Sequence, residues 1–530
     1  MTDQATAPPS KLDGAVLKIA GVVVLGAIMS ILDITVVSVA LPTFQSEFDA
    51  TYAQVAWTMT GYTLALATVI PLSGWVADRF GTKRLYMLAL LLFTLGSMLC
   101  ATADTIEQLV AFRVLQGLGG GMLMPIGMTI MTRAAGPQRI GRLMAVLGVP
   151  MLLGPILGPI MGGWLIQVAS WNWIFLVNVP LGVIALVYAW LVLAKDAPEP
   201  SESFDFLGMA LMSPGLALFL YGVSSIPGEG TAAAPKVWAT MLGGAVLMGL
   251  FVLHSFRPQH PLIDLRLFRN RNLTLTVITM FLFAGAFFGG LLLVPTYFQE
   301  VRGESTLHAG LLVAPQGIGA MLTMPIAGSL ADRLPIGRIV PIGISVILVG
   351  LLGLTQVGPD TSYAFLIGSL FVMGLGMGGT MMPLFTAALK VLRHHEVARG
   401  STLLNITQQV ASSCGVALMS VLLTNHLNSS PVVPGSTHVP QLPNGLTETG
   451  AAIMHSTRPS AFEQLAAALH ITPQMLADGL DQAAAAFAHT YWVAWGLVAL
   501  TLVPALLLPK RRSAEPEAEE EPGEEPVLMH

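Results

Sequence analysis

Long apolar segments separated by short polar turns make up most of this 530-residue sequence. Each segment is bounded by charged residues, Pro or Gly, and about 20 apolar residues in a helix are enough to cross the ~30 Å hydrocarbon core of a bilayer. Fourteen segments fit this description, at roughly 17–41, 54–77, 84–103, 107–132, 140–168, 171–194, 205–226, 237–256, 272–299, 308–331, 339–357, 361–389, 400–426 and 485–509. The pattern therefore predicts an all-α polytopic membrane protein with 14 transmembrane helices.

Composition agrees with this interpretation and excludes an ordinary soluble domain. Hydrophobic residues make up 54% of the chain and charged residues only 10%, against about 25% charged residues in a typical soluble domain. Cys100 and Cys414 both fall in apolar segments, so we expect small packing residues, with no disulfide and no metal site. The first apolar segment is too long for the core of a signal peptide and lacks a small-residue cleavage site, so we expect it to be retained as a helix.

The distribution of basic residues predicts how the chain is oriented. An even number of helices puts both termini on the same side, and Lys and Arg favour the cytoplasmic side. With the amino terminus in the cytoplasm, 21 of the 25 Lys and Arg residues lie on that face, three lie outside (Lys236, Arg302 and Arg458), and Arg113 lies within the membrane. We therefore predict a multi-pass membrane protein with both termini in the cytoplasm.

Two sequence patterns occur twice, which indicates an internal repeat. GWVADRFGTKR at 74–84 follows the second apolar segment, and GSLADRLPIGR at 328–338 follows the tenth. GGMLMP at 120–125 is repeated as GGTMMP at 378–383. We therefore expect two six-helix halves with two helices inserted between them. The predicted parts are a cytoplasmic tail (1–16), a first half (17–194), a linker with two extra transmembrane helices (195–271), a second half (272–509) with an outer loop (427–484), and an acidic cytoplasmic tail (510–530).

Asp33 is the one carboxylate well inside an apolar segment. An ionisable group there costs at least ~2.5 kcal/mol, so it is a functional-site hypothesis by default. A helical rise of ~1.5 Å per residue puts Asp33 ~12 Å and Arg113 ~9 Å below the outer ends of their helices, so both lie at similar depth. A carboxylate that exchanges an arginine partner for a proton can couple transport, and Asp33 must be the titrating member because Arg stays charged. The alternative is a permanent ion pair with no transport role.

Motifs along nearly the whole chain resemble one family. The matching stretches are LDITVVSVALP at 32–42, the 74–84 loop, RVLQG at 113–117, GPILGPIMGG at 154–163 and WNWIFLVNVP at 171–180. Together they are similar to the fourteen-helix drug:H+ antiporter family of the major facilitator superfamily, which are multidrug efflux transporters. Parallel repeats with a midplane substrate site are the architecture of that superfamily. Two residues depart from the family pattern, since Ser38 replaces the usual Asn and Asn172 the usual Arg.

The short 74–84 loop makes the second and third helices antiparallel neighbours, and it lets Asp78 approach the amino terminus of a nearby helix, where a carboxylate is stabilised by the dipole. The resemblance implies that this loop is part of a gate. Its residues are Gly74, Asp78, Arg79, Gly81, Lys83 and Arg84, with Asp332 and Arg333 as counterparts in the second half. Alternatively, the basic residues only satisfy the positive-inside rule.

In the fifth segment, Gly154, Gly158 and Gly162 recur every four residues and so share one helix face, which allows close helix packing. Pro155 and Pro159 are expected to bend this helix. The resemblance implies an antiporter signature, which also includes Gly163, packing across the interface between the halves and limiting leak. Generic packing by a glycine stripe would explain the same residues.

Candidates for a substrate cavity are polar and aromatic side chains near the middle of the predicted helices. They are Tyr62, Gln116, Asn178, Gln316, Asn405, Gln408 and Gln409. Each of them could instead form a hydrogen bond between helices.

The resemblance implies a proton-coupled antiporter that exports amphiphilic drugs or toxic compounds across the cytoplasmic membrane. The alternatives are a dedicated exporter of an endogenous metabolite or lipid and a non-transporting receptor or scaffold. The sequence contains no Walker loop and no catalytic or metal-ligand cluster, so we expect no enzyme and no cofactor, with the proton gradient as the energy source. The expected partners are small amphiphilic substrates, protons and membrane lipids, without nucleic acid, and an envelope accessory protein is left open.

Overall fold

The computed structural model describes residues 13–135, 139–195, 204–229, 233–258, 261–304, 306–393, 396–428 and 473–510. Regular secondary structure in these residues is helical, and none of them lies in a strand. This confirms the predicted all-α fold. Residues 196–203 of the predicted linker, most of the outer loop and most of both tails lie outside the described residues.

The helices follow one another in the order that the apolar pattern predicts. They are α1 (Gly14–Glu47), α2 (Tyr52–Phe80), α3 (Thr82–Cys100), α4 (Ile106–Ala135), α5 (Ile140–Val168), α6 (Trp173–Leu176), α7 (Asn178–Val192), α8 (Phe206–Glu229), α9 (Pro235–Ser255), the 3-10 helix η1 (Leu265–Arg269), α10 (Arg271–Glu300), α11 (Thr306–Arg333), α12 (Ile336–Leu354), α13 (Tyr363–Gly378), α14 (Met381–Lys390), α15 (Val397–Asn428) and α18 (Pro473–Leu506).

Thirteen spans among the described residues are long and apolar enough to cross a membrane. Two of these spans combine consecutive helices, α6 with α7 and α13 with α14. The 29-residue helix α5 accounts for the one remaining predicted segment. Each of the 14 apolar segments therefore corresponds to a helical span, and the chain is a multi-pass membrane protein.

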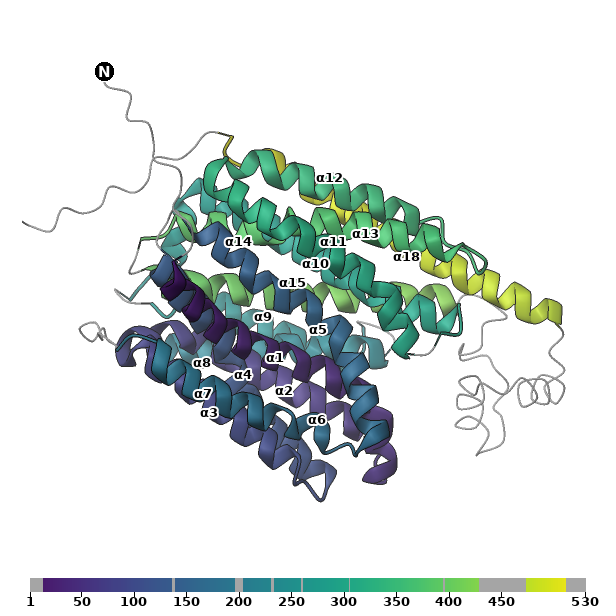
Figure 1. Cartoon of the computed structure of the whole chain (residues 1–530), viewed down its shortest axis with the longest axis horizontal. Helices are drawn as coiled ribbons and strands as arrows, with labels where there is room; N and C mark the ends of the chain where they lie inside the picture. Colours follow the sequence, from purple (N-terminus) through teal and green to yellow (C-terminus); the bar gives the residue numbers. More distant parts are fainter. Residues whose placement is uncertain are drawn as a thin grey trace, which may run out of the picture.

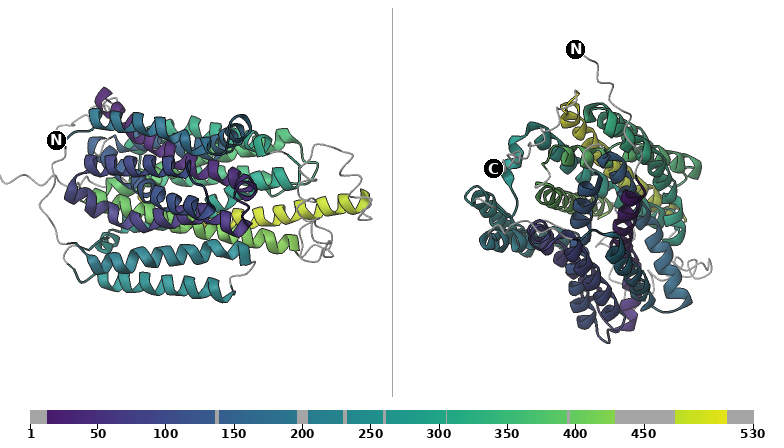
Figure 2. Two further views of the ribbon diagram at one scale, coloured as in Figure 1. Left: turned by 90° about the horizontal axis from the view of Figure 1, so that it is seen from below. Right: turned by 60° about the vertical axis from the view of Figure 1, so that its left-hand side comes forward.

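The helices form two groups along the chain, α1–α7 and α10–α18, which we call the first and second halves. Figure 1 shows them on opposite sides of the bundle, with α5, α14 and α15 between. The helices α8 and α9 lie together along one side (Figure 2). Leu216 and Leu220 of α8 pack with Ile70 of α2 and Ile406 of α15, so α8 contacts both halves.

Two predicted segments contain a break that the apolar pattern did not reveal. The segment at 361–389 divides between Gly378 and Met381. Pro383 lies just beyond this point, and its nitrogen has no hydrogen to donate to the preceding turn. The matching GGMLMP stretch stays within the continuous helix α4. The segment at 171–194 divides at Val177, and Pro180 lies in the first turn of α7, where a helix leaves its N–H groups unpaired in any case.

Two helices are longer than their apolar windows. α1 continues to Glu47, beyond the predicted end near Leu41, and α18 begins at Pro473 instead of 485. The added part of α18 contains Ala483 and Ala484, and Ala has the highest helix propensity. An apolar window marks only the part of a helix inside the hydrocarbon core, so polar extensions were missed.

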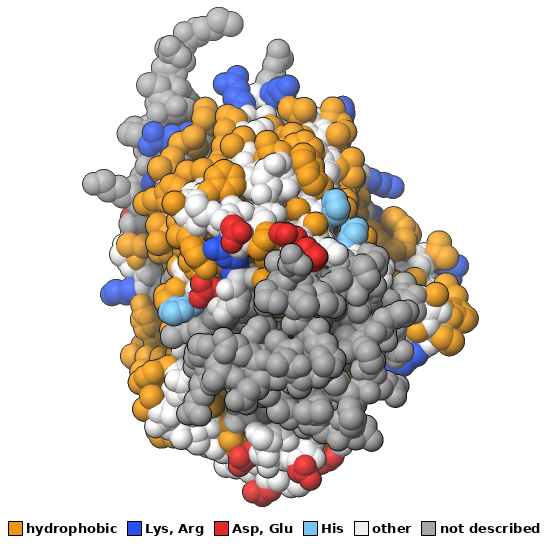
Figure 3. Space-filling model, turned by 90° about the vertical axis from the view of Figure 1, so that its right-hand side faces the viewer, with side chains coloured by type: hydrophobic (Ala, Val, Ile, Leu, Met, Phe, Trp, Pro, Cys, Tyr) orange, Lys and Arg blue, Asp and Glu red, His pale blue; other side chains and the backbone are white. Residues whose placement is uncertain are grey.

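Both described termini lie at one end of the bundle. Asp13 pairs with Arg139 at 2.8 Å, and the Pro509 carbonyl accepts a hydrogen bond from the Gly337 N–H at the start of α12. We call this the basic end, because Lys83, Arg84, Arg133, Arg139, Arg142, Lys195, Arg333, Arg338 and Lys390 flank the helix termini there. Lys236 and Arg302 lie at the opposite end, which Figure 3 shows.

Contacts between the halves gather near the basic end. A Cβ atom on Gly141 of α5 would lie 2.4 Å from the carbonyl oxygen of Gly328 in α11, so these two backbones are in close contact. The hydroxyls of Ser73 in α2 and Thr402 in α15 share a hydrogen bond of 3.1 Å. All four residues lie within two turns of the basic end of their helices. The two halves are therefore joined there.

Candidate functional site

A polar cluster lies inside the first half, where α1, α3, α4 and α7 meet. Asp33 of α1 is 2% exposed and Arg113 of α4 is fully buried. The Nη1 atom of Arg113 donates to Oδ2 of Asp33, so the two groups form a buried ion pair. Removing two charges from water costs several kcal/mol per ion unless other hydrogen bonds compensate. The remaining polar groups of the cluster supply those bonds.

The Asp33 carboxylate has amide partners on its other oxygen. Its Oδ1 atom accepts hydrogen bonds from Gln116 Nε2 at 2.8 Å and from Asn178 Nδ2 at 3.1 Å. Both amides also donate to the hydroxyl of Ser97 at 3.0 Å, and this hydroxyl donates to the Phe175 carbonyl. Side chains from α3, α4 and the start of α7 therefore hold the Asp33 carboxylate of α1 in a single position.

Arg113 has neutral acceptors in addition to Asp33. Its Nε atom donates to the Thr58 carbonyl at 3.1 Å, and Nη1 donates to Gln116 Oε1 at 2.6 Å. The guanidinium carbon also lies 4.1 Å from the centre of the Tyr62 ring, a cation–π distance. The cation therefore keeps partners when the carboxylate is neutral.

Glycines make this arrangement sterically possible. A Cβ atom on Gly96 would lie 2.6 Å from Cα of Gln116, and one on Gly117 would lie 2.5 Å from the Tyr62 carbonyl oxygen. Any larger residue would push α3 and α2 away from α4. Neither Gly96 nor Ser97 stood out in the sequence, because single small residues are common in transmembrane helices.

The structure brings together five predicted site residues from two predicted groups. Asp33 and Arg113 were expected to form a coupling pair, whereas Tyr62, Gln116 and Asn178 were expected to line a cavity. All five are almost fully buried. The two amides bind the carboxylate, and Tyr62 lies against the guanidinium. Chemically, the cluster holds one buried carboxylate between a guanidinium and two amide donors.

The other four cavity candidates belong to the second half. Gln316 of α11 is 3% exposed, and neither polar atom of its amide has a hydrogen-bond partner among the described residues. Asn405 of α15 donates to the Ser401 carbonyl at 2.8 Å, and its Nδ2 lies 3.3 Å from Sδ of Met128 in α4. Gln408 and Gln409 are partly buried, about one turn further from the basic end on the same helix.

Asp332 links the two halves at the basic end. Its carboxylate accepts hydrogen bonds from the backbone N–H groups of Gly141 (3.0 Å) and Arg142 (3.3 Å), in the first turn of α5. The Nζ atom of Lys390 lies 2.9 Å from the same carboxylate. A carboxylate at a helix amino terminus is stabilised by unpaired N–H groups and by the helix dipole. The second-half loop thus makes the contact that the sequence suggested for Asp78.

The first-half loop forms different contacts. Asp78 pairs with Arg133 at 2.9 Å. Gly81 has φ +95° and is the single residue between α2 and α3, a turn that favours glycine. A Cβ atom on Gly74 would lie 3.3 Å from the Ala398 carbonyl oxygen of α15. Of the predicted gate cations, Arg79, Arg84 and Arg333 are exposed, and Lys83 is partly buried and donates to the Trp190 and Leu193 carbonyls.

The glycine stripe of α5 packs differently from what the resemblance implied. A Cβ atom on Gly154 would lie 2.1 Å from Cγ2 of Ile31, and one on Gly158 would lie 1.9 Å from Oγ1 of Thr35. Gly162 likewise faces Val36. These three glycines therefore contact α1 within the first half. The expectation that they pack across the interface between the two halves is wrong. The sequence could not choose between the two neighbours of α5.

Gly163 adds little to the helix contact. A Cβ atom on Gly163 would meet nothing within 4 Å. The side chains of Pro155 and Pro159 lie outside the described residues. Of the two departures from the family pattern, Ser38 is exposed, and Asn172 donates to the Ala101 carbonyl at 2.8 Å, which ties the start of α6 to the end of α3.

Comparison with known proteins places the chain in a family. The Major Facilitator Superfamily sequence model matches residues 23–416. A Mycobacterium tuberculosis protein named multidrug resistance protein B homolog is 48% identical over 509 residues, with 96% of this chain and 92% of the relative covered. An Escherichia coli protein named putative multidrug resistance protein MdtD is 31% identical, with 81% of this chain and 88% of the relative covered. The chain belongs to the major facilitator superfamily, a class of membrane transport proteins.

Solved structures show the same fold at low sequence identity. The human organic anion transporter MFSD10 (TETRAN) has a TM-score of 0.56 at 15% identity, with 92% of this chain and all of that chain covered. The proton:xylose symporter XylE has a TM-score of 0.56 at 14% identity, with 93% and 96% covered. These similarities support the two-half fold and do not bear on the substrate.

Proposed function

We propose that this protein is a proton-coupled antiporter that exports amphiphilic drugs or other toxic compounds across a bacterial cytoplasmic membrane. The names of the two multidrug resistance relatives support the substrate class. The observation that carries proton coupling is the Asp33–Arg113 ion pair, buried in the first half with neutral partners for both groups. The energy source is the proton gradient, without a cofactor.

The partners of the ion pair allow it to cycle between two protonation states. When Asp33 is ionised, it has a cation and two amide donors, so no buried charge is left uncompensated. When Asp33 takes up a proton, Arg113 keeps the Gln116 and Thr58 oxygens as acceptors. Hydrogen-bond acceptors for Arg113 therefore remain in both states, while the protonated state leaves the Arg113 charge without its anion and is the higher in energy.

The contacts between the two halves at the basic end, which we call the joint, suggest on which side of the membrane this conformation is closed. In our proposal this end faces the cytoplasm with both termini, so the described conformation is closed toward the cytoplasm. Opening would separate Gly141 from Gly328 and release Asp332 from the amino terminus of α5. The joint therefore combines close packing of α5 on α11, where Gly328 faces Ala145, with the hydrogen bonds of Asp332, and opening would have to separate both.

Transport into inverted membrane vesicles tests the proposal. An imposed proton gradient should drive uptake of a lipophilic monocationic dye and of a neutral drug, and a protonophore should abolish it. Asp33→Asn should lose the uptake, whereas Asp104→Asn, an exposed carboxylate at the opposite end, should keep it. Uptake that persists with a protonophore would contradict proton coupling, and uptake of neither compound would contradict the substrate class.

A further inference from the structure

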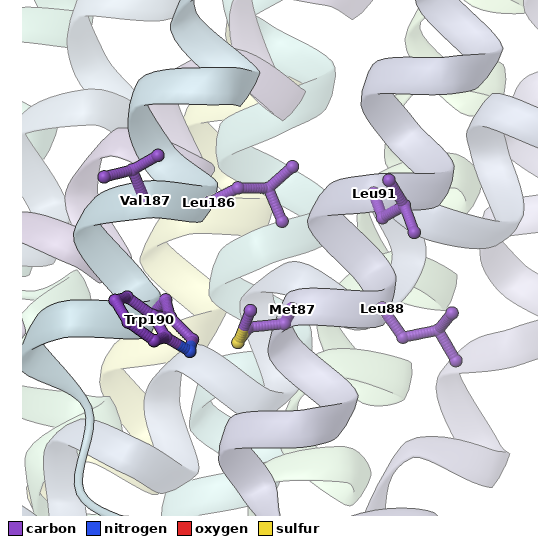
Figure 4. Close-up of a pocket in the computed structure, with 6 residues that line it drawn as sticks. All are labelled: Met87, Leu88, Leu91, Leu186, Val187 and Trp190. Atoms are coloured by element: carbon purple, nitrogen blue, oxygen red, sulfur yellow. The ribbon is translucent and has the colours of Figure 1, made fainter.

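A wholly apolar groove lies on the outside of the first half, between α3 and α7. It has a volume of about 550 Å³ and is lined by Met87, Leu88, Leu91, Leu186, Val187 and Trp190. Figure 4 shows that Met87 and Leu186 point into the space between the two helices. The outer walls are exposed, with Val187 at 53% and Trp190 at 63%. Both helices are membrane spans, so this groove opens to the lipid.

The groove lies within the leaflet at the basic end. Met87 and Leu91 lie five and nine residues from the start of α3 at Thr82, which is ~8 and ~14 Å at 1.5 Å per residue. Half of a ~30 Å hydrocarbon core is ~15 Å. Trp190, near the end of α7, is at the level where Trp side chains mark the membrane interface.

Three cations lie at the basic ends of the two helices that form the groove. Lys83 Nζ donates to the carbonyls of Trp190 and Leu193 at 2.7 Å, which holds its charge at the end of α7. Arg84 follows Lys83, and Lys195 lies two residues beyond Leu193. Arg84 and Lys195 are both exposed. Basic pockets between transmembrane helices bind anionic lipid headgroups.

From this combination we propose that the groove binds one anionic glycerophospholipid. An acyl chain fills the space between α3 and α7, and the phosphate lies against Lys83, Arg84 and Lys195. A cationic amphiphilic substrate does not suit the site, because three positive charges repel its head. The inference does not depend on proton coupling.

A bound lipid at this position also stabilises helices that hold the polar cluster. On the side of α3 and α7 toward the bundle core, Ser97 and Asn178 share a hydrogen bond of 3.0 Å. A Cβ atom on Gly182 would lie 2.0 Å from Oγ1 of Thr94, so the two helices are in close contact between the groove and that bond. Lipid that binds the folded protein raises its unfolding temperature by mass action.

Native mass spectrometry of the delipidated full-length protein, titrated with phosphatidylglycerol, tests the site. Phosphatidylcholine with the same chains is the zwitterionic comparison, and glycerol phosphate tests the headgroup alone. We expect one phosphatidylglycerol to bind at least tenfold more tightly than phosphatidylcholine, with no measurable binding of glycerol phosphate. Equal binding of the two lipids, or tight binding of glycerol phosphate, would overturn the proposal.

Two pairs of matched variants locate the binding. Val187→Trp fills the groove, and Val246→Trp adds the same bulk at a membrane-facing position of α9 with similar exposure, 51%. We expect only the first to lose the tight lipid. Arg84→Gln with Lys195→Gln should reduce the preference for phosphatidylglycerol several-fold, whereas Arg338→Gln with Lys510→Gln, at exposed positions of the same end, should not. Retention of the tight lipid in Val187→Trp, with normal elution as a folded protein, would place the lipid elsewhere and refute the site.

Discussion

The two halves have the same fold but bury different groups at their centres. In the first half, Asp33 and Arg113 form an ion pair that the Gln116 amide completes. In the second half, α10 occupies the place of α1 in the repeat and carries Phe283 and Phe287, whose stacked rings lie 5.5 Å apart. Among the described residues, Asp332 is the only buried carboxylate of the second half, and it lies at the basic end.

At the basic end the two halves are more alike. Asp78 at the end of α2 pairs with Arg133 at the end of α4. Asp332 at the end of α11 pairs with Lys390 at the end of α14. The repeat therefore has a carboxylate–cation pair near the joint in both halves and an ion pair at the centre of only one. We infer that the ionisable groups that act in transport lie at the centre of the first half, while the centre of the second half contributes apolar and amide side chains.

The largest difference between the halves should appear in stability. Arg113→Leu leaves the Asp33 carboxylate buried without its cation, and removal of one partner of a buried pair costs ~3–5 kcal/mol. Phe287→Leu in the second half loses only part of one ring, about 1–2 kcal/mol. Thermal unfolding in detergent measures both. An Arg113→Leu protein as stable as Phe287→Leu would show that the pair contributes little.

Substitutions in the joint should lower the rate of transport and leave substrate affinity nearly unchanged. Asp332→Asn weakens a carboxylate that binds two backbone N–H groups and Lys390, so we expect a roughly tenfold loss of transport. Asp78→Asn should also lower transport, because it weakens the pair with Arg133. Substrate affinity should change by less than twofold in each. A loss of affinity equal to the loss of flux would mean that these residues shape the binding site.

The amide donors of Asp33 should have intermediate effects. Gln116→Leu and Asn178→Ala each remove one hydrogen bond to a carboxylate, worth about 1.5–3 kcal/mol. We expect lower stability and several-fold slower transport that is still coupled to protons. Asn172→Ala, which loses a neutral bond to the Ala101 carbonyl outside the cluster, is the matched control. If this control loses as much stability as the two amide variants, the carboxylate is not what the amides stabilise.

Gln316 should give the smallest effect on stability. Its amide is buried without a partner among the described residues, and such a group is unfavourable. Gln316→Leu should therefore leave the unfolding temperature unchanged or raise it. If Gln316 binds substrate, the same change should weaken the binding of a neutral drug several-fold. A lower unfolding temperature would instead indicate that the amide has a structural role.

The sequence predicted the helices well because the bilayer imposes one requirement on all of them, about 20 apolar residues per span. It could not place the break before Met381 or the start of α18 at Pro473, because those depend on backbone hydrogen bonds and on helix beyond the hydrocarbon core. Periodicity showed that Gly154 and Gly158 share a face. It could not show that this face packs on α1, because a stripe fits either neighbour.

Five members of the candidate site were predicted, but only the charged pair was predicted in the arrangement that the structure shows. Asp33 and Arg113 are conspicuous because charges are rare and costly in an apolar helix. The hydrogen bonds that Gln116 and Asn178 donate to Asp33 and to Ser97 depend on how four helices meet, and the role of a polar uncharged side chain cannot be read from its type. For the same reason, Gln116 and Asn178 were expected in a cavity and not around the carboxylate.

Proton release on substrate binding tests the central claim most directly. The purified protein is mixed with a lipophilic monocation in weakly buffered solution, and a pH indicator records the protons released per bound molecule. We predict about one proton from the unmodified protein and from Asp104→Asn, and none from Asp33→Asn, although Asp33→Asn still folds and inserts. Unchanged proton release from Asp33→Asn would contradict the assignment of Asp33 as the coupling group.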